Sequence, residues 1–100
     1  MNKHIAHNEG YKYVPLDDYK NYFYSNDFPI SVTLLSKGFD LVTIDKEDEG
    51  RGKFIFVFKL TTSLGTVVDE YWLHRISVDP LDYENHRKNL KSRMFALLSK

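Results

Sequence analysis

Basic residues gather in one short stretch near the end of the sequence. Residues 86–93 are His-Arg-Lys-Asn-Leu-Lys-Ser-Arg. Arg87 and Lys91 are four residues apart, and Lys88 and Lys91 are three apart, so a helix would bring these cations near one face. Lysine and arginine side chains contact the phosphates of nucleic acids without regard to base sequence. The sequence therefore predicts these phosphate contacts: Arg87, Lys88, Lys91 and Arg93.

The same charges also have a structural interpretation. Asp79, Asp82 and Glu84 precede the basic stretch, and the helix dipole favours acidic residues at the start of a helix and basic residues toward its end. An acidic protein partner is a further alternative to phosphate. The chain has 14 basic and 14 acidic residues, so its net charge of zero gives no overall attraction to nucleic acid or to an anionic membrane. Only a local patch could supply that attraction.

A second group of charges surrounds two glycines in the middle of the chain. Gly50 and Gly52 flank Arg51, which a hairpin turn would expose and which we predict as a secondary phosphate contact. The carboxylates before this turn offer the oxygen ligands that calcium and magnesium prefer. They are Asp45, Glu47, Asp48 and Glu49. Their spacing differs from that of a calcium-binding loop and Lys46 interrupts them, so we interpret them as a solvated approach to the hairpin turn.

The histidines fit metal binding or catalysis only in part. His4, His7 and Glu9 resemble half of a zinc or nickel site, but a closed site needs four rigid ligands. Residues 1–10 are polar and end in glycine, which is typical of a flexible tail. His74 follows two acidic residues and could act as a general base, but no nucleophile or glycine-rich phosphate loop lies nearby in the sequence. The sequence predicts no catalytic, cofactor or metal site, and we do not expect an enzyme.

Tyrosines are concentrated in residues 11–24. Their rings could stack on unpaired bases or could cover a sheet. Leu16, Tyr19 and Phe23 have the spacing of a short helix, whereas residues 20–25 fit a strand equally well. The sequence leaves both the structure and the role of this segment open.

Length and composition predict one small domain after the tail. Of the 100 residues, 42% are hydrophobic and 15% aromatic, so residues 11–100 fit a single α+β domain whose core is dominated by rings. The chain has no cysteine, which excludes disulfides and cysteine metal sites and fits a reducing compartment. The N-terminal residues lack an apolar signal region, and no apolar run is long enough to span a membrane. We expect a cytoplasmic protein without a membrane segment.

A β-hairpin covered by helices is the predicted architecture. Residues 39–45 and 53–60 are rich in β-branched and aromatic residues and flank the glycine-containing turn. Three helices are predicted at residues 27–37, 62–73 and 80–98, each beginning beside an Asp, Asn, Thr or Ser that can cap it. Apolar residues at helical spacing predict the side of each helix that faces inward. These stripes are Phe28, Val32, Leu34 and Leu35 in the first helix; Leu64, Val67, Val68, Tyr71 and Trp72 in the second; and Tyr83, Leu90, Met94 and Leu97, with Phe95 and Leu98 beside them, in the third.

The second strand of the hairpin is apolar on both faces. It contains the run Phe54-Ile55-Phe56-Val57-Phe58, so both faces of the hairpin need cover. Three helices can cover one face well and the other only in part. We therefore predict a homodimer, in which a second copy pairs strand edges or stacks sheets to bury the rest.

Short motifs spread over residues 24–96 resemble one family of small proteins. The motifs are Tyr24-Ser25-Asn26-Asp27-Phe28, Leu34-Leu35-Ser36-Lys37-Gly38-Phe39, Phe56-Val57-Phe58, Tyr71-Trp72, Val78-Asp79-Pro80 and Asn89-Leu90-Lys91-Ser92-Arg93-Met94-Phe95. The family that they resemble is found in bacteria, their phages and mobile elements and is described only as a domain of unknown function. Its members favour small residues in the first helix, where this chain has Ile30, Ser31 and Val32, and the N-terminal extension is longer here. The resemblance supports the order of elements and implies no activity.

Two functions are predicted on these grounds. The first is that of a small non-enzymatic accessory protein that binds nucleic acid through the basic face of the last helix. The second is that of a protein-interaction module, for example a phage-encoded inhibitor or scaffold, that uses exposed aromatic residues of the hairpin or of the N-terminal segment.

Overall fold

The computed structural model describes residues 21–46 and 53–98. Six elements follow one another in this part of the chain: β1 (Tyr22–Ser25), α1 (Phe28–Ser36), β2 (Leu41–Lys46), β3 (Phe54–Lys59), α2 (Thr62–Trp72) and α3 (Pro80–Leu98). The predicted α+β fold is confirmed, and the predicted strands and helices match these bounds to within about two residues. The turn at 47–52 and the predicted tail at 1–10 lie outside the described residues.

β3 is the central strand of an antiparallel sheet with the order β1-β3-β2. β2 and β3 form the predicted hairpin, with Ile44 opposite Phe56. β1 pairs with the other edge of β3 and places Phe23 opposite Phe58. The strand alternative is thus confirmed at Tyr22–Ser25 and the helical one is wrong there, because a strand at this position pairs the backbone groups of β3 that the hairpin leaves open.

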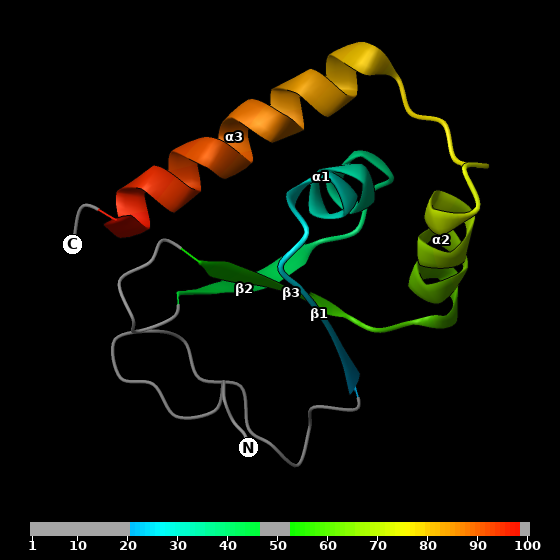
Figure 1. Ribbon diagram of the computed structural model, residues 1–100, viewed down its shortest axis with the longest axis horizontal. Helices are drawn as coiled ribbons and strands as arrows, with labels where there is room; N and C mark the ends of the chain where they lie inside the picture. Colours follow the sequence, from blue (N-terminus) through cyan, green and yellow to red (C-terminus); the bar gives the residue numbers. More distant parts are fainter. Residues whose placement is uncertain (1–20, 47–52, 99–100) are drawn as a thin grey trace.

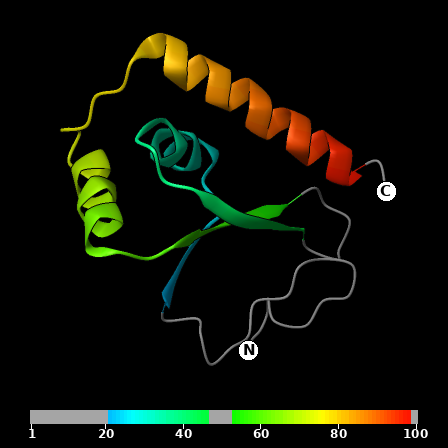
Figure 2. The same cartoon turned by 180° about the vertical axis from the view of Figure 1, so that it is seen from behind.

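α1 and α3 lie on one side of the sheet, and α2 lies beside its end (Figures 1 and 2). Phe54, Phe56 and Phe58 face the helices together, because alternate residues of a strand share a face. These rings form one core with buried residues of the other elements, namely Val32, Leu34, Ile44, Leu64 and Leu90. Each large apolar side chain that is fully buried stabilises the fold by about 1.5–3 kcal/mol. Leu90, near the middle of α3, therefore anchors this helix in the core, where α3 packs chiefly against α1.

The opposite face of the sheet is buried in part. Thr43, Asp45 and Val57 lie on this face and are buried, Val57 completely. Figure 1 shows α1 and α3 on the other side of the sheet. Because Val57 is already buried within a single chain, one reason for expecting a second copy is weakened, and the homodimer stays a prediction.

α1 is buried on nearly all sides, so its predicted stripe is too narrow. The five consecutive residues Ile30–Leu34 are buried, whereas Phe28 and Leu35 are only partly buried. The reason is that α1 packs against both α2 and α3 and contributes to the core beside the sheet. Ser31 and Thr33 are tolerated there because each hydroxyl donates to a backbone carbonyl one turn earlier, at 2.9 Å.

The ends of α1 are set by local side-chain and backbone chemistry. The carboxylate of Asp27 accepts a hydrogen bond from the Ile30 N–H at 3.0 Å, which satisfies one of the unpaired donors at the start of a helix. Gly38 follows the helix with φ +96°, a left-handed conformation that glycine adopts readily. The Phe39 N–H then donates to the Leu34 carbonyl at 3.0 Å. This turn directs the chain into β2.

Three residues of the predicted stripes are exposed instead of buried. Trp72 and Phe95 are each 60% exposed, and Leu98 is 47% exposed. Phe95 comes five residues after the buried Leu90, which places it about 140° around the helix from the core. Trp72 is eight residues after Leu64 and lies about 80° away from it, at the edge of the stripe. Exposed aromatic side chains therefore lie on α2 and α3, and the hairpin rings Phe54, Phe56 and Phe58 are buried.

Candidate functional site

The four basic residues predicted as phosphate contacts all lie on α3. The helix begins after Asp79, whose Oδ2 accepts a hydrogen bond from the Asp82 N–H at 3.0 Å, and Pro80 occupies its first position. Lys88, Lys91 and Arg93 are exposed, and Arg87 is partly buried. Arg51, the secondary contact, lies outside the described residues, as do the tyrosines of residues 11–20.

Arg87 is paired with an acidic residue one turn earlier. Its Nε donates to Glu84 Oε1 at 2.9 Å and its Nη2 donates to Oε2 at 2.7 Å. The two parallel hydrogen bonds match the planar guanidinium to the carboxylate. The hydrogen bond from Arg87 holds the pKa of Glu84 below its ordinary value. Arg87 is therefore engaged within the protein, and its charge is offset by Glu84.

Arg93 lies on a different side of α3 from the two lysines. It follows Lys91 by two residues, which corresponds to about 160° around the helix axis. Arg93 instead lines a hollow of about 400 Å³ between α3 and β2, together with Val42, Thr43, Ile44, Ala96 and Leu97. The structure therefore does not bring the four predicted cations onto one face. Lys88 and Lys91 remain together.

A mixed basic and apolar surface runs along α3 on the side away from Leu90. We call this surface the outer face of α3. Its residues follow one another at alternating steps of three and four positions, and they are Leu81, Glu84, Lys88, Lys91, Phe95 and Leu98. Phe95 was missed as a site residue because its sequence position fits the edge of the apolar stripe. The spacing of seven residues between Lys88 and Phe95 was the signal that could have placed the ring on the lysine side.

The helix dipole explains the basic stretch less well than the sequence indicates. The dipole acts on charges within the last turn of a helix, and the last turn of α3 contains no basic residue. Lys46 from β2 reaches this turn instead, where its Nζ donates to the Leu97 carbonyl at 3.4 Å. Lys88 and Lys91 lie in the middle of the helix, so their positions have no such structural explanation.

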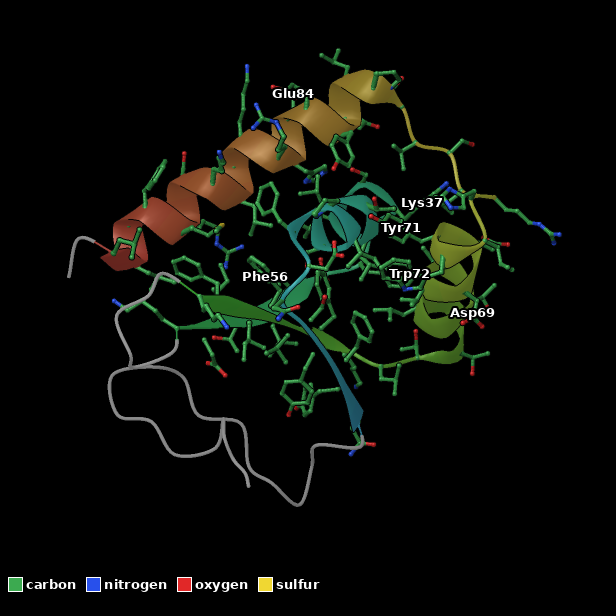
Figure 3. All side chains as sticks on the ribbon, viewed as in Figure 1. Lys37, Phe56, Asp69, Tyr71, Trp72 and Glu84 are labelled. Atoms are coloured by element: carbon green, nitrogen blue, oxygen red, sulfur yellow. The ribbon has the colours of Figure 1, made fainter. Side chains whose placement is uncertain are left out.

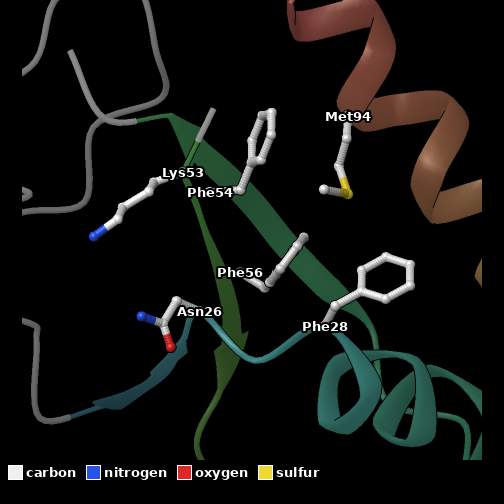
Figure 4. A pocket seen from close by; sticks show the side chains of 6 residues that line it. All are labelled: Asn26, Phe28, Lys53, Phe54, Phe56 and Met94. Carbon is white, nitrogen blue, oxygen red and sulfur yellow. The ribbon is translucent and has the colours of Figure 1, made fainter. Parts of the chain in front are cut away.

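A small pocket lies between the sheet, the start of α1 and α3 (Figure 4). It has a volume of about 260 Å³ and is lined by Asn26, Phe28, Lys53, Phe54, Phe56 and Met94. The Phe28 and Phe56 rings are 6.3 Å apart between centroids, and Phe54 and Phe56 are themselves buried core residues. The pocket is smaller than a typical ligand site of about 300–1,000 Å³. We interpret it as a gap in the packing at the edge of the core.

Groups for metal or acid–base chemistry do not gather in the described residues. No three His, Asp or Glu side chains within 21–46 and 53–98 could hold a metal ion together. His74 is exposed and takes a φ of 61° in the turn after α2, where its N–H donates to the Tyr71 carbonyl at 3.1 Å. The half-site at His4, His7 and Glu9 and the carboxylates at 47–49 lie outside these residues.

Asp45 is the one buried carboxylate in the described part of the chain. It is 4% exposed, and neither of its oxygens accepts a hydrogen bond from a described residue. Burial raises the pKa of Asp45 from 3.8 to about 6, because a charged carboxylate is disfavoured away from water. Asp45 faces the side of the sheet opposite Phe56 and α3, so it does not belong to the outer face of α3.

Within the described residues, no helix combines the length and the apolar character needed to cross a membrane. Searches of curated proteins and of solved structures gave no match. A family model does match residues 20–96, which covers the motifs spread over residues 24–96. The predicted relationship is confirmed: the chain belongs to the family described as a domain of unknown function, DUF5659.

Proposed function

We propose that this chain is a non-enzymatic protein that binds single-stranded nucleic acid through the outer face of α3. The observation that carries the proposal is the place of Phe95. This ring is 60% exposed and lies one turn after Lys91 and two turns after Lys88 on the same side of the helix. Exposed rings beside lysines are the combination with which proteins bind unpaired strands.

The charges of α3 support contact with phosphates. Residues 87–98 include Arg87, Lys88, Lys91 and Arg93 and no acidic residue. Glu84, the acidic member of the outer face, is paired with Arg87. Lys88 and Lys91 therefore give the outer face a local positive charge although the chain as a whole is neutral.

The ring favours unpaired strands over a duplex. A base within a duplex is stacked on both sides, whereas an unpaired base can stack on an exposed aromatic face. At a rise of about 1.5 Å per residue, Lys88 and Phe95 are about 10 Å apart along the helix, which corresponds to about three stacked bases at 3.4 Å. The lysines would hold the backbone and Phe95 would stack on one base.

Titration of labelled oligonucleotides tests this function. Single-stranded and double-stranded DNA and RNA are titrated at about 50 and 200 mM salt, and binding is followed by fluorescence anisotropy. We expect single strands to bind, duplexes to bind less tightly, and the single-strand affinity to fall with salt at a logarithmic slope of about −1.4 for two phosphate contacts. Absence of binding at the lower salt concentration contradicts the proposal.

The second candidate is a protein-interaction module, and a specific observation favours it. Trp72 is 60% exposed at the end of α2, and exposed aromatic side chains are enriched at protein interfaces. The rings of the hairpin itself do not serve this purpose, because Phe54, Phe56 and Phe58 are buried. A protein partner would therefore dock beside α2.

A further inference from the structure

Trp72 lines a hollow at the junction of α2, β1 and the start of α1. The hollow has a volume of about 510 Å³ and is lined by Tyr24, Ser25, Asn26, Asp27, Ile55 and Trp72. The indole is 60% exposed. Figure 3 shows Tyr71 and Trp72 on the side of α2 that faces α1 and the sheet. An exposed aromatic ring therefore faces a space that is large enough for one long side chain.

The position of the Trp72 ring is supported by its neighbour. The rings of Tyr71 and Trp72 meet edge to face, with centroids 5.0 Å apart and planes at 89°. This is one of the preferred arrangements of aromatic pairs. The contact restricts the rotation of the indole on one side, and a side chain that is already restricted loses less entropy on binding.

The hollow also contains a negative charge. Asp27 uses Oδ1 to accept the hydrogen bond from the Ile30 N–H. Within the described residues the only ion pair joins Glu84 and Arg87, so no described cation balances Asp27 at ion-pair distance. Burial raises the pKa of Tyr71, and the negative charge of Asp27 raises it further. The Asp27 carboxylate is partly buried and lines the same hollow as the Trp72 indole.

We propose that this hollow binds an arginine side chain of a partner protein. The planar guanidinium would stack on the Trp72 indole and donate hydrogen bonds to Asp27. Arginine stacks on aromatic faces and pairs with carboxylates through its fixed fork of N–H groups, whereas the ammonium of lysine has no planar surface to stack. The site is independent of the nucleic-acid proposal, because Trp72 and Asp27 do not belong to the outer face of α3.

Tryptophan fluorescence measures binding at this site directly, because Trp72 is the single tryptophan of the chain. A blocked peptide Gly-Arg-Gly is titrated against the full chain, and the intrinsic fluorescence is recorded. Two peptides serve as controls. The peptide with citrulline in place of arginine has nearly the same shape but no charge, and a Gly-Lys-Gly peptide keeps the positive charge but lacks the planar guanidinium. We expect a saturable change with the arginine peptide and at least tenfold weaker binding of the other two. No saturable change with arginine, or equal binding of citrulline or lysine, overturns the proposal.

Matched variants assign the binding to these residues. Asp27→Asn removes the charge but keeps a good helix cap, and we expect at least tenfold weaker arginine binding. Trp72→Leu is measured by calorimetry, and we expect a similar loss. Asp69→Asn is the control, because Asp69 is exposed and lies on the outer side of α2 in Figure 3. Unchanged binding in the Asp27 and Trp72 variants, or an equal loss in Asp69→Asn, contradicts the assignment, and circular dichroism verifies that each variant is folded.

Discussion

Glu84 and Arg87 form a bidentate ion pair on α3, with hydrogen bonds of 2.9 and 2.7 Å. This pair changes the interpretation of the basic stretch. Arg87, the first of the predicted phosphate contacts, is held by a carboxylate, and that carboxylate is the acidic residue of the outer face. The net positive charge of the outer face therefore comes from Lys88 and Lys91.

Replacing Glu84 by Gln should strengthen binding to single-stranded nucleic acid. The substitution removes the negative charge and replaces the bidentate ion pair by at most one neutral hydrogen bond from Arg87 to the Gln oxygen, which makes Arg87 available as a third phosphate contact. We expect tighter binding and a salt dependence that is steeper by about 0.7 in logarithmic slope, the value for one added contact on a single strand. Anisotropy titrations at several salt concentrations measure this slope. Asp82→Asn is the control on another side of the helix, and a slope that changes equally in both variants contradicts the role of the ion pair.

Replacing Phe95 by Ala should weaken binding without unfolding the protein. The ring is 60% exposed, so its loss costs little core packing, whereas one base stacked on a ring contributes about 1–3 kcal/mol to binding. The dissociation constant for a single strand should rise accordingly, and duplex binding should change less. Leu98→Ala removes apolar surface from the same face but no ring. If both variants bind single strands as the parent chain does, Phe95 does not stack on a base.

The fold could be predicted in most of its elements because their signals are local. Asp27 and Gly38 mark the two ends of α1 through the cap and the left-handed turn. The run of β-branched and aromatic residues from Phe54 to Phe58, beside a glycine-containing turn, predicts a strand, and the sheet confirms it. The sequence leaves the segment around β1 open, since Leu16, Tyr19 and Phe23 have helical spacing whereas residues 20–25 fit a strand equally well. β1 is a strand because it pairs with β3, and the paired residues are far apart in the sequence.

The candidate site could be predicted only in part, for two physical reasons. A helical spacing gives the angle between residues but not which side faces the core, so the sequence predicts Phe95 beside the buried stripe. Residue types also do not show which charges are already paired, and the ion pair of Arg87 became visible only in the structure. The separation of Arg93 from Lys91 was available from helix geometry alone.

The buried carboxylate of Asp45 should make stability depend on pH. Its pKa is raised from 3.8 to about 6 by burial, so the folded protein binds this proton more tightly than the unfolded chain. The stability linked to Asp45 is therefore greatest below about pH 4, falls as the pH rises from about 4 to 6, and stays low above that range. Relative to the variant Asp45→Asn, the parent chain should lose about 1–3 kcal/mol of unfolding free energy between pH 4 and pH 7.

Urea unfolding of both proteins across this pH range measures the difference. The difference in unfolding free energy between the two proteins is followed as the pH changes. Any effect of the substituted amide side chain that does not depend on pH therefore cancels. Asp40→Asn is the matched control, because Asp40 is exposed just before β2. Parallel profiles of the parent chain and Asp45→Asn would show that Asp45 is solvated or paired in the folded protein.

Leu90 and Leu81 should differ sharply when each is replaced by Ala. Leu90 is 1% exposed and Leu81 is 68% exposed on the same helix. Loss of a buried leucine leaves a cavity and should cost about 2–5 kcal/mol of unfolding free energy, whereas the exposed substitution should change it by less than about 0.5 kcal/mol. Both variants replace one leucine by alanine, so urea unfolding compares the same chemical change at a buried and at an exposed position. Equal destabilisation would mean that Leu90 does not anchor α3 in the core.

Charge reversal on the outer face of α3 tests the proposed function most directly. The double variant Lys88→Glu/Lys91→Glu is compared with Arg75→Glu/Arg93→Glu, which changes the net charge equally but on other surfaces. Anisotropy with labelled single-stranded DNA at about 50 mM salt should show a rise in the dissociation constant of about tenfold or more for the lysine variant and a much smaller rise for the arginine variant. Equal losses in the two variants, or unchanged binding by the lysine variant, would contradict nucleic-acid binding through this face.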